Sequence, residues 1–273
     1  MLKRTLLAMV ISLIFISACS GISSPSGSSP DTSEDDTLTV LAAASLTEAF
    51  EDLGERFEAQ NPGTTVVFNF AGSQQLAQQL AQGAPGDVFA SANQVQMQNV
   101  VTAGRVDPDK DSIMVGNRLA IVYPPDNPAG IRRMLDLARP GIRLVLGDEA
   151  VPVGGYSLEF LEKASQDASF GAQFTESVLS NVASYEQSVR AVLNKVILGE
   201  ADAGIVYSSD VIDAGSIGVG VLPIPDLLNT NASYAIAPIS DSKKSELAEA
   251  FISYVISTEG QDILATYGFR PVY

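Results

Sequence analysis

The chain alternates short apolar strands with amphipathic helices, and the links between them are brief. Strands are predicted at 38–44, 64–70 and 87–92, and helices begin at Ser45, at Ser73 and near Val95. Apolar residues of the first helix recur every three or four positions, as on one face of a helix. Strands that are each followed by a helix run parallel, and the helices cover both faces of their sheet. The alternation therefore predicts an α/β protein with mainly parallel sheets.

A second set of elements follows a long extended stretch at 113–123. It comprises helices near 130–138, from about Ser157 and at 188–198, and strands at 142–146 and 203–207. Another extended stretch at 232–238 precedes two final helices near 242–257 and 259–267. The two extended stretches are candidate crossings between two sheets. We therefore predict two lobes joined by a hinge, with residues 38–116 and 234–273 in lobe 1 and residues 117–233 in lobe 2.

The first 37 residues have the composition of an export signal followed by a tether. A basic start precedes an apolar run from Leu6 to Ile16, which is short for a membrane span. The run ends in Ile16-Ser17-Ala18-Cys19, which resembles a bacterial lipobox. We predict a signal peptide at 1–18, a lipid on Cys19 and a flexible tether at 19–37, rich in Ser, Gly, Pro and then acidic residues. The body is therefore expected outside the cytoplasm, anchored to a membrane.

The charge balance and the missing residue types exclude several classes of function. The net charge is −16, and it becomes −18 once Lys3 and Arg4 leave with the predicted signal peptide. Nucleic acid is not an expected partner, because its recognition needs a basic surface. Histidine is absent and Cys19 is the only cysteine, which removes Ser-His-Asp triads and the common zinc sites. A serine–lysine hydrolase or a carboxylate-based enzyme stays open.

Two serines stand where a predicted strand passes into a helix, Ser45 after three alanines and Ser73 after Gly72. Ligands of open α/β sheets bind at the carboxyl ends of strands, where first-turn N–H groups and the helix dipole favour an anion. Each serine could offer a hydroxyl and a backbone N–H. Local pattern alone favours plain capping, since Ser45-Leu46-Thr47-Glu48 fits a capping box. Gly72 favours a ligand at Ser73, because glycine allows close approach to the backbone.

Three residues of the second set could complete a site for an anion. Val153 lies in a glycine-bearing loop at 151–156 ahead of a helix, and Val189 lies in the first turn of the helix at 188–198. A valine can contribute only its backbone N–H, and on local pattern both segments are ordinary loops. Tyr207 ends a strand and carries a hydroxyl donor, although a core tyrosine is an equal alternative.

Five motifs occur in order along almost the whole predicted body. They are Ala42-Ala43-Ala44-Ser45-Leu46, Phe70-Ala71-Gly72-Ser73, Gly83-Ala84-Pro85-Gly86-Asp87-Val88-Phe89, Gly147-Asp148 with Val151-Pro152-Val153-Gly154, and Gly204-Ile205-Val206-Tyr207-Ser208-Ser209-Asp210. With these motifs the chain resembles the bacterial periplasmic molybdate-binding proteins of ABC transporters, from about Leu38 to Phe269. The resemblance implies the two-lobed fold of type 2 periplasmic binding proteins, which close on a ligand about a hinge.

The resemblance also implies a site. Ser45, Ser73, Val153, Val189 and Tyr207 would bind molybdate, with tungstate as a second ligand, and molybdenum would be held only as the oxyanion, without a cofactor. Molybdate is a fully deprotonated dianion near neutral pH, so hydrogen-bond donors alone can satisfy it in a dry cleft. The chain would then be a monomeric receptor, not an enzyme, that delivers its ligand to a membrane permease.

Two alternatives stay open beside this reading. The first alternative is a receptor for sulfate or another tetrahedral oxyanion, because hydrogen-bond donors alone do not distinguish the central atom of the anion. A secreted hydrolase with Ser45 or Ser73 as nucleophile is the other, although neither serine has an obvious lysine partner. Arg190 is expected to pair with a carboxylate or to orient its own helix rather than to bind the anion. Ser188 departs from the acidic residue that family members often carry there.

Overall fold

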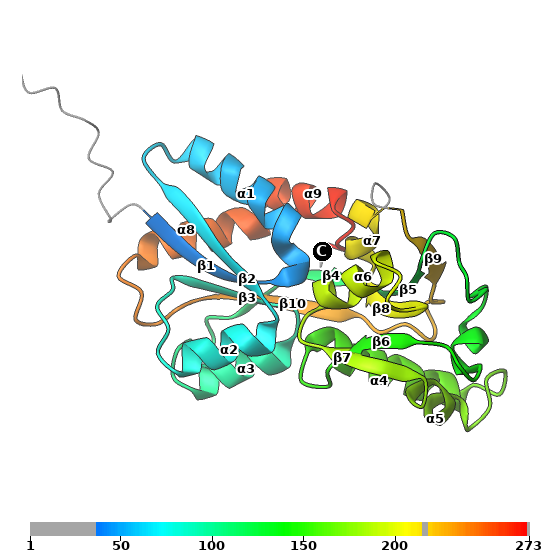
Figure 1. Cartoon of the computed structure of the whole chain (residues 1–273). Coiled ribbons are helices and arrows are strands. Elements are labelled where there is room, and N and C mark those ends of the chain that lie inside the picture. Colours follow the sequence, from blue (N-terminus) through cyan, green and yellow to red (C-terminus); the bar gives the residue numbers. More distant parts are fainter. Residues whose placement is uncertain (1–36, 215–217, 272–273) are drawn as a thin grey trace, which may run out of the picture. The chain divides into compact units, whose positions relative to one another are not determined.

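The computed structural model describes residues 37–214 and 218–271 of the chain. The predicted signal peptide, Cys19 and the tether up to residue 36 lie outside the described residues. The described residues form two five-stranded sheets flanked by helices (Figure 1). The predicted α/β class with two lobes is therefore confirmed, while the exact limits of the lobes stay predictions. No helix in the described ranges is long and apolar enough to cross a membrane.

The first sheet combines parallel and antiparallel strands. Its spatial order is β2 (Thr65–Ala71), β1 (Thr37–Ala43), β3 (Val88–Ser91), β10 (Ala232–Pro238) and β4 (Ser112–Asn117). β1 pairs in parallel with β2 and β3, whereas β10 runs antiparallel to β3 and β4.

The second sheet repeats this arrangement. Its order is β7 (Val182–Glu186), β6 (Leu144–Gly147), β8 (Ala203–Tyr207), β5 (Leu119–Tyr123) and β9 (Gly220–Pro223). β6 pairs in parallel with β7 and β8, whereas β5 runs antiparallel to β8 and β9. Each sheet is thus mixed. The strands β4, β5, β9 and β10 flank the crossings between the sheets, and each of them pairs antiparallel with its neighbours.

Helices cover both faces of the first sheet. Figure 1 shows α1 (Thr47–Gln60), α8 (Ser245–Ile256) and α9 (Thr258–Thr266) on one face and α2 (Ser73–Ala81) and α3 (Gln94–Thr102) on the other. Val40 and Ala42 of β1 belong to the core under α1, whereas Leu41 between them packs with α2 and α3. Neighbouring strand residues point to opposite faces, so β1 is apolar on both. Phe57 and Phe251 join α1 to α8 edge to face, with ring centroids 5.3 Å apart.

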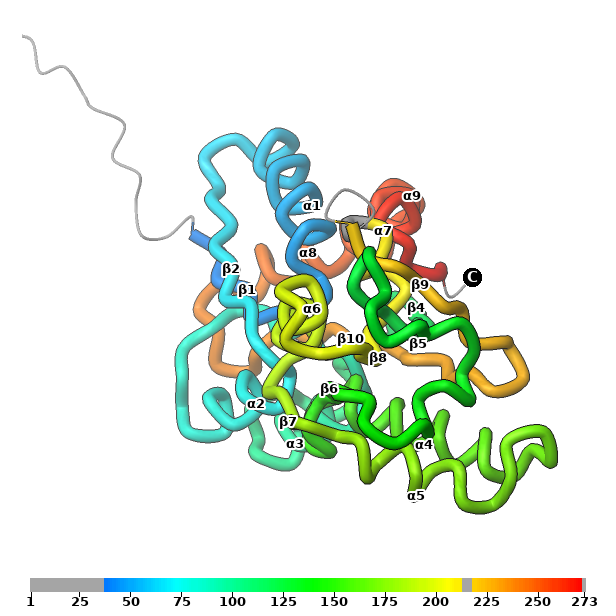
Figure 2. The backbone as a smooth tube through the Cα atoms, turned by 45° about the vertical axis from the view of Figure 1, so that its right-hand side comes forward, coloured from blue at the N-terminus to red at the C-terminus, as the bar shows by residue number. Residues whose placement is uncertain are grey.

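Helices also cover the second sheet, with α4 (Pro152–Gln166) and α5 (Phe174–Leu179) on one face and α6 (Val189–Ile197) on the other (Figure 2). α7 (Ser208–Ala214) follows β8 directly. The sequence did not indicate α5 and α7, which are short helices, or β7 and β9, which are edge strands without the continuous apolar run of the buried strands. α4 begins at Pro152 rather than at Ser157, since proline is favourable in a first turn while Gly154 and Gly155 obscure the helical pattern.

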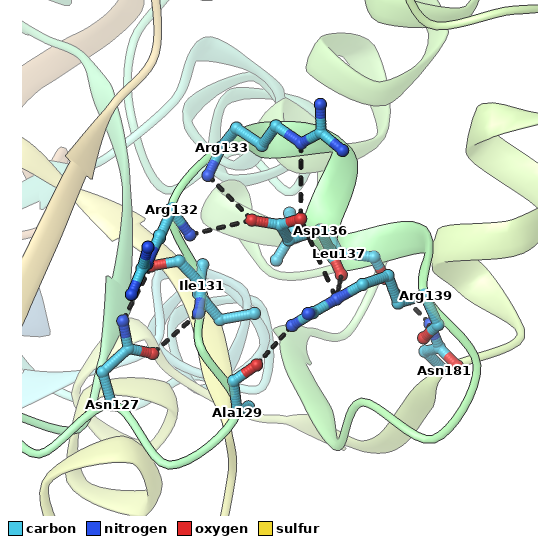
Figure 3. A network of polar contacts seen from close by, with 9 residues as sticks. All are labelled: Asn127, Ala129, Ile131, Arg132, Arg133, Asp136, Leu137, Arg139 and Asn181. Carbon is cyan, nitrogen blue, oxygen red and sulfur yellow. Dashed lines mark hydrogen bonds and ion pairs between the residues drawn. The ribbon is translucent and has the colours of Figure 1, made fainter.

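The helix predicted near 130–138 is wrong, because this segment is a loop that ends in the 3₁₀ helix η3 (Met134–Ala138). The buried carboxylate of Asp136 accepts from the N–H groups of Arg132 and Arg133 at 2.9 and 3.0 Å (Figure 3). The side-chain amide of Asn127 bonds both main-chain groups of Ile131, at 2.7 and 2.8 Å. Side chains that bond nearby backbone groups compete with helix formation, and here they hold the loop.

The chain passes between the sheets at two connections in the described ranges. β4 ends at Asn117 and β5 begins at Leu119, so the predicted stretch 113–123 is two strands in different sheets. The return runs from β9 to β10. Asn229 of the return accepts from the N–H of Leu119 at 3.0 Å and donates to its C=O at 2.9 Å. The two connections are therefore tied side by side, as a hinge requires.

Candidate functional site

A pocket lies between the lobes, at the carboxyl ends of β1, β2 and β3 on one side and of β6, β7 and β8 on the other. It holds about 220 Å³ of space, partly open to solvent. All five predicted site residues line it, in a wall formed by Ala43, Ala44, Ser45, Gly72, Ser73, Ala92, Val151, Pro152, Val153, Ser188, Val189 and Tyr207. The alanines and Pro152 were not predicted, because their side chains carry no donor and only their position after a strand could have indicated them.

Ser45 is not a helix cap, so the capping interpretation is wrong here. It lies in the 3₁₀ turn Ala44–Leu46 that precedes α1, and α1 begins after Leu46 without a side-chain cap. Ser45 is 4% exposed, and its Oγ lies 2.8 Å from Tyr234 Oη on β10. The expected capping box fails because Glu48 points to the other lobe, where it pairs with Arg190.

Ser73 is the first residue of α2, after Gly72 at the N-cap position, so it is not a cap either. Its Oγ accepts a hydrogen bond from the N–H of Ala92 at 3.0 Å, and the residue is 1% exposed. A backbone N–H can only donate, so the Ser73 hydroxyl keeps its own proton for another acceptor. Since Ser73 and Ala92 both line the pocket, that proton is available to a bound ligand.

The second lobe presents two helix N-termini to the pocket. Val153 follows Pro152 in the first turn of α4, and Val189 is the first residue of α6. N–H groups of a first turn have no intrahelical acceptor and lie at the positive end of the helix dipole. Gly154 packs so closely on the end of β6 that a Cβ would lie 2.0 Å from the C=O of Asp148. This glycine therefore lets the start of α4 reach the strand end.

Tyr207 contributes a buried hydroxyl at the end of β8. The residue is 1% exposed, and its Oη has no hydrogen-bond partner among the described residues. Burial holds the pKa of Tyr207 well above its ordinary value, and the nearby hydroxyl of Tyr234 adds to the shift without meeting hydrogen-bond geometry. The hydroxyl is therefore protonated near neutral pH. A buried donor without an acceptor costs stability unless a ligand supplies one.

Among the described residues, no charged side chain lines the pocket. Arg190, next to Val189, forms an ion pair with Glu48 and lies 3.5 Å from Asp210, so its charge is matched by carboxylates, as expected. Its Nε also donates to the C=O of Ala44 at 3.3 Å, an oxygen that Thr47 Oγ1 bonds at 2.8 Å. These donors occupy a carbonyl beside the pocket that would otherwise repel an anion.

Further contacts between the lobes lie around the pocket, beyond the hydrogen bond from Arg190 to Ala44. Besides the pair of Glu48 and Arg190, Gln74 Nε2 donates to the C=O of Gln187 at 2.8 Å, and Gln96 Nε2 donates to the C=O of Ala150 at 3.1 Å. The first partner of each pair lies in lobe 1 and the second in lobe 2. The lobes are therefore drawn together over the pocket, which stays partly open to solvent.

Comparison with known proteins shows which family the chain belongs to. Residues 38–270 match the family model of the bacterial extracellular solute-binding proteins. The molybdate-binding protein ModA from Mycobacterium tuberculosis is 38% identical over 261 residues, which cover 96% of this chain and 94% of that protein. ModA from Escherichia coli is 33% identical over 242 residues, which cover 85% and 88% of the two chains.

A solved structure agrees with the fold. The sulfate-binding protein SubI from Mycobacterium tuberculosis superposes with a TM-score of 0.78 and covers 86% of this chain and 87% of its own. Its sequence identity of 23% supports the fold alone. The chain therefore belongs to the bacterial extracellular solute-binding protein family, and the resemblance of its motifs to the molybdate-binding proteins is confirmed.

Proposed function

We propose that this chain captures molybdate outside the cytoplasm and delivers it to the membrane permease of an ABC transporter. Tungstate, a tetrahedral dianion of similar size and charge, is a second ligand. The observation that carries the proposal is the pocket wall, where three buried hydroxyls meet the first turns of helices and no described residue brings a charged side chain. The relatives that are named for molybdate binding support the ligand class.

Donors alone suit a fully deprotonated oxyanion. Burying a dianion is costly unless hydrogen bonds replace its water, and charge-assisted hydrogen bonds are stronger than neutral ones. We assign this role to the hydroxyls and N–H groups of Ser45 and Ser73, the N–H groups of Val153 and Val189, and the hydroxyl of Tyr207. Hydrogen phosphate would bring a proton that needs an acceptor, and no carboxylate of residues 37–214 or 218–271 lines the pocket. The donor set therefore favours molybdate over phosphate.

A binding role accounts for the two serines better than catalysis does. Within the described residues, Ser45 Oγ bonds Tyr234 Oη and Ser73 Oγ bonds the N–H of Ala92. Neither partner is a base that could take the proton of a serine nucleophile. Cys19 lies outside the described residues, and we propose that its lipid holds the monomeric receptor at the membrane, near its permease.

Calorimetric titration of the purified protein with molybdate, tungstate, sulfate and phosphate tests the proposal. We expect tight binding of one molybdate or tungstate per chain and far weaker binding of sulfate and phosphate. Sulfate that binds as tightly as molybdate would favour the general oxyanion receptor instead. If none of the four anions binds, the proposed function is wrong.

A further inference from the structure

A line of buried polar groups runs from Ser45 to the place where the chain crosses between the lobes. We propose that Tyr234 and Asn117 act as positioning residues that direct the Ser45 proton into the pocket. This inference rests on the proposed anion binding and deepens it, because it names what makes Ser45 a donor rather than an acceptor toward the ligand. Each group in the line is buried, with exposed fractions of 4% for Ser45, 0% for Tyr234 and 1% for Asn117.

The backbone sets the orientation of the Asn117 amide. The N–H of Arg118 donates to Asn117 Oδ1 at 2.9 Å, and the hydroxyl of Ser208 donates to the same oxygen at 3.1 Å. Since a backbone N–H can only donate, the amide oxygen faces these two groups. The NH₂ group of Asn117 therefore faces the other way, toward Ser209 Oγ at 2.8 Å and Tyr234 Oη at 3.3 Å.

The direction of the remaining hydrogen bonds follows from this orientation. An amide NH₂ has donors only, so Tyr234 Oη accepts from Asn117. Tyr234 has a single proton, and Ser45 Oγ lies 2.8 Å away to accept it. The nearby Tyr207 Oη takes no hydrogen bond from any described residue. Ser45 therefore accepts from Tyr234, and its own proton is left for the pocket that it lines.

Tyr234 keeps its proton under ordinary conditions. Burial raises the pKa of Tyr234 well above its usual value, and the charge of Asp210 adds to the increase. The groups around its hydroxyl, Ser45 and Asn117, are neutral. The hydroxyl is thus a permanent donor to Ser45 near neutral pH.

The same line spans the hinge. Asn117 is the last residue of β4 in the first sheet, and Ser208 and Ser209 begin α7 directly after β8 of the second sheet. The Asn117 amide that orients Tyr234 is therefore held from both lobes. The arrangement also has a consequence for selectivity: with one of its two lone pairs engaged by Tyr234, Ser45 has less capacity to accept a proton from hydrogen phosphate.

A double-mutant cycle with Tyr234→Phe and Ser45→Ala tests the inference by molybdate titration. Tyr234→Phe removes the neutral hydrogen bond that Ser45 accepts from Tyr234, so we expect the affinity for molybdate to fall about three- to ten-fold. In the Ser45→Ala background the same change should have almost no effect, because the group it orients is gone. The variant should stay folded, since Asn117 Nδ2 keeps Ser209 Oγ as an acceptor at 2.8 Å.

Selectivity gives a readout that a purely structural role would not change. Tyr234→Phe frees a lone pair on Ser45, so the ratio of molybdate affinity to phosphate affinity should fall below that of the unchanged protein. Tyr156→Phe is the matched control. Its hydroxyl accepts from the N–H of Ser233 at 3.3 Å and does not line the pocket. It should leave both affinities unchanged.

A second variant covers the case in which Tyr234→Phe does not fold. Asn117→Asp replaces the donor to Tyr234 with an acceptor, which turns the Tyr234 proton away from Ser45. Its loss of molybdate affinity should be smaller in the Ser45→Ala background, where only the added charge acts. Equal effects of Tyr234→Phe with and without Ser45, or an unchanged selectivity ratio, would overturn this inference while molybdate binding stands. A protein that binds no oxyanion would overturn the proposed function itself.

Discussion

Three buried hydroxyls in the pocket wall keep a proton that no described acceptor takes. Ser45 accepts a hydrogen bond from the Tyr234 hydroxyl, and Ser73 accepts one from the N–H of Ala92. Tyr207 Oη has no partner among the described residues. A site that offers donors in a fixed direction needs no cationic side chain to hold a dianion. The negative net charge of the chain is thus compatible with anion binding.

At the scale of single residues, we predict that Ser73→Ala weakens molybdate binding about ten- to hundred-fold, which is the range for a hydrogen bond to a charged group. The free energy of unfolding should fall by about 1 kcal/mol, because the N–H of Ala92 loses its acceptor. Titration and urea unfolding measure both. Ser165→Ala, a hydroxyl bonded to Thr175 far along α4, is the control that should keep full affinity. Unchanged binding in Ser73→Ala would remove Ser73 from the site.

Tyr207→Phe should separate affinity from stability. The free protein should be as stable as before or slightly more so, because the variant removes a buried hydroxyl that has no described partner. Molybdate affinity should fall at least ten-fold, since the ligand loses a charge-assisted hydrogen bond. Thermal unfolding with and without molybdate measures both effects. A clear loss of stability in the free protein would show that the hydroxyl has a structural role.

Helix starts, rather than whole helices, make up the site. α2, α4 and α6 and the 3₁₀ turn before α1 all begin at the pocket, and each follows the end of a parallel strand. Glycines allow these starts to come close to other backbone. At Gly72 a Cβ would lie 2.3 Å from the C=O of Gln187 in the other lobe, so this glycine serves lobe closure. The sequence had suggested close approach of a ligand instead.

Gly72→Ala should therefore hinder closure without disturbing the first lobe. The backbone angles of Gly72, φ −59° and ψ 134°, are accessible to alanine, so the fold should tolerate the change. The added methyl group would meet Gln187 and keep the lobes apart, and molybdate affinity should drop more than ten-fold. Small-angle scattering should show that ligand no longer compacts the protein.

Gly155→Ala is the matched control for this prediction. It adds a methyl group inside α4, where the nearest atom would be the C=O of Glu149 at 3.7 Å. Alanine is the better helix former by about 1 kcal/mol, so this variant should be as stable or more stable and should bind normally. Equal affinity in the two glycine variants would rule out the proposed role of Gly72 in closure.

At the scale of the molecule, the ion pair of Glu48 and Arg190 links the lobes beside the pocket. Both side chains are partly exposed, at 36% and 22%, so the pair contributes at most about 1 kcal/mol. Glu48→Gln should raise the dissociation constant for molybdate about two- to five-fold through faster release. Stopped-flow kinetics measures the release rate.

The control for Glu48→Gln is Asp52→Asn, which removes the pair with Arg56 inside the same helix. That ion pair lies within α1 and does not link the two lobes, so the rate of molybdate release should stay unchanged. The difference between the two variants should also shrink at high salt, because screening weakens a partly exposed pair. Faster release in both variants alike would point to the charge of α1 rather than to closure.

The buried tyrosines predict how stability depends on pH. Burial raises the pKa of Tyr207 and Tyr234 well above 10, so above pH 10 these residues lose their protons in the unfolded chain first. The unfolded state is then favoured, and the free energy of unfolding should fall by about 1.4 kcal/mol per pH unit for each tyrosine. Urea unfolding from pH 8 to 11 measures this. Tyr207→Phe should reduce the slope, and a flat profile would contradict the prediction.

Local sequence determined most of the elements and singled out five residues that line the pocket. Strands β1, β2, β3, β6, β8 and β10 and the helices with clear apolar periodicity lie where the pattern predicts them, because that periodicity reflects one buried face. All five predicted site residues line one pocket, since the ends of parallel strands meet at the same edge of a sheet. The five sequence motifs in addition indicated the protein family.

Other features depend on contacts between residues far apart in the sequence, which local pattern does not contain. Asn181 donates to the C=O of Leu137 in the segment expected to be a helix, 44 positions away, and Glu48 pairs with Arg190 in the other lobe, 142 positions away. The partner of Ser45 is Tyr234, 189 positions away, so only the folded chain decides that this serine donates to the pocket instead of capping a helix.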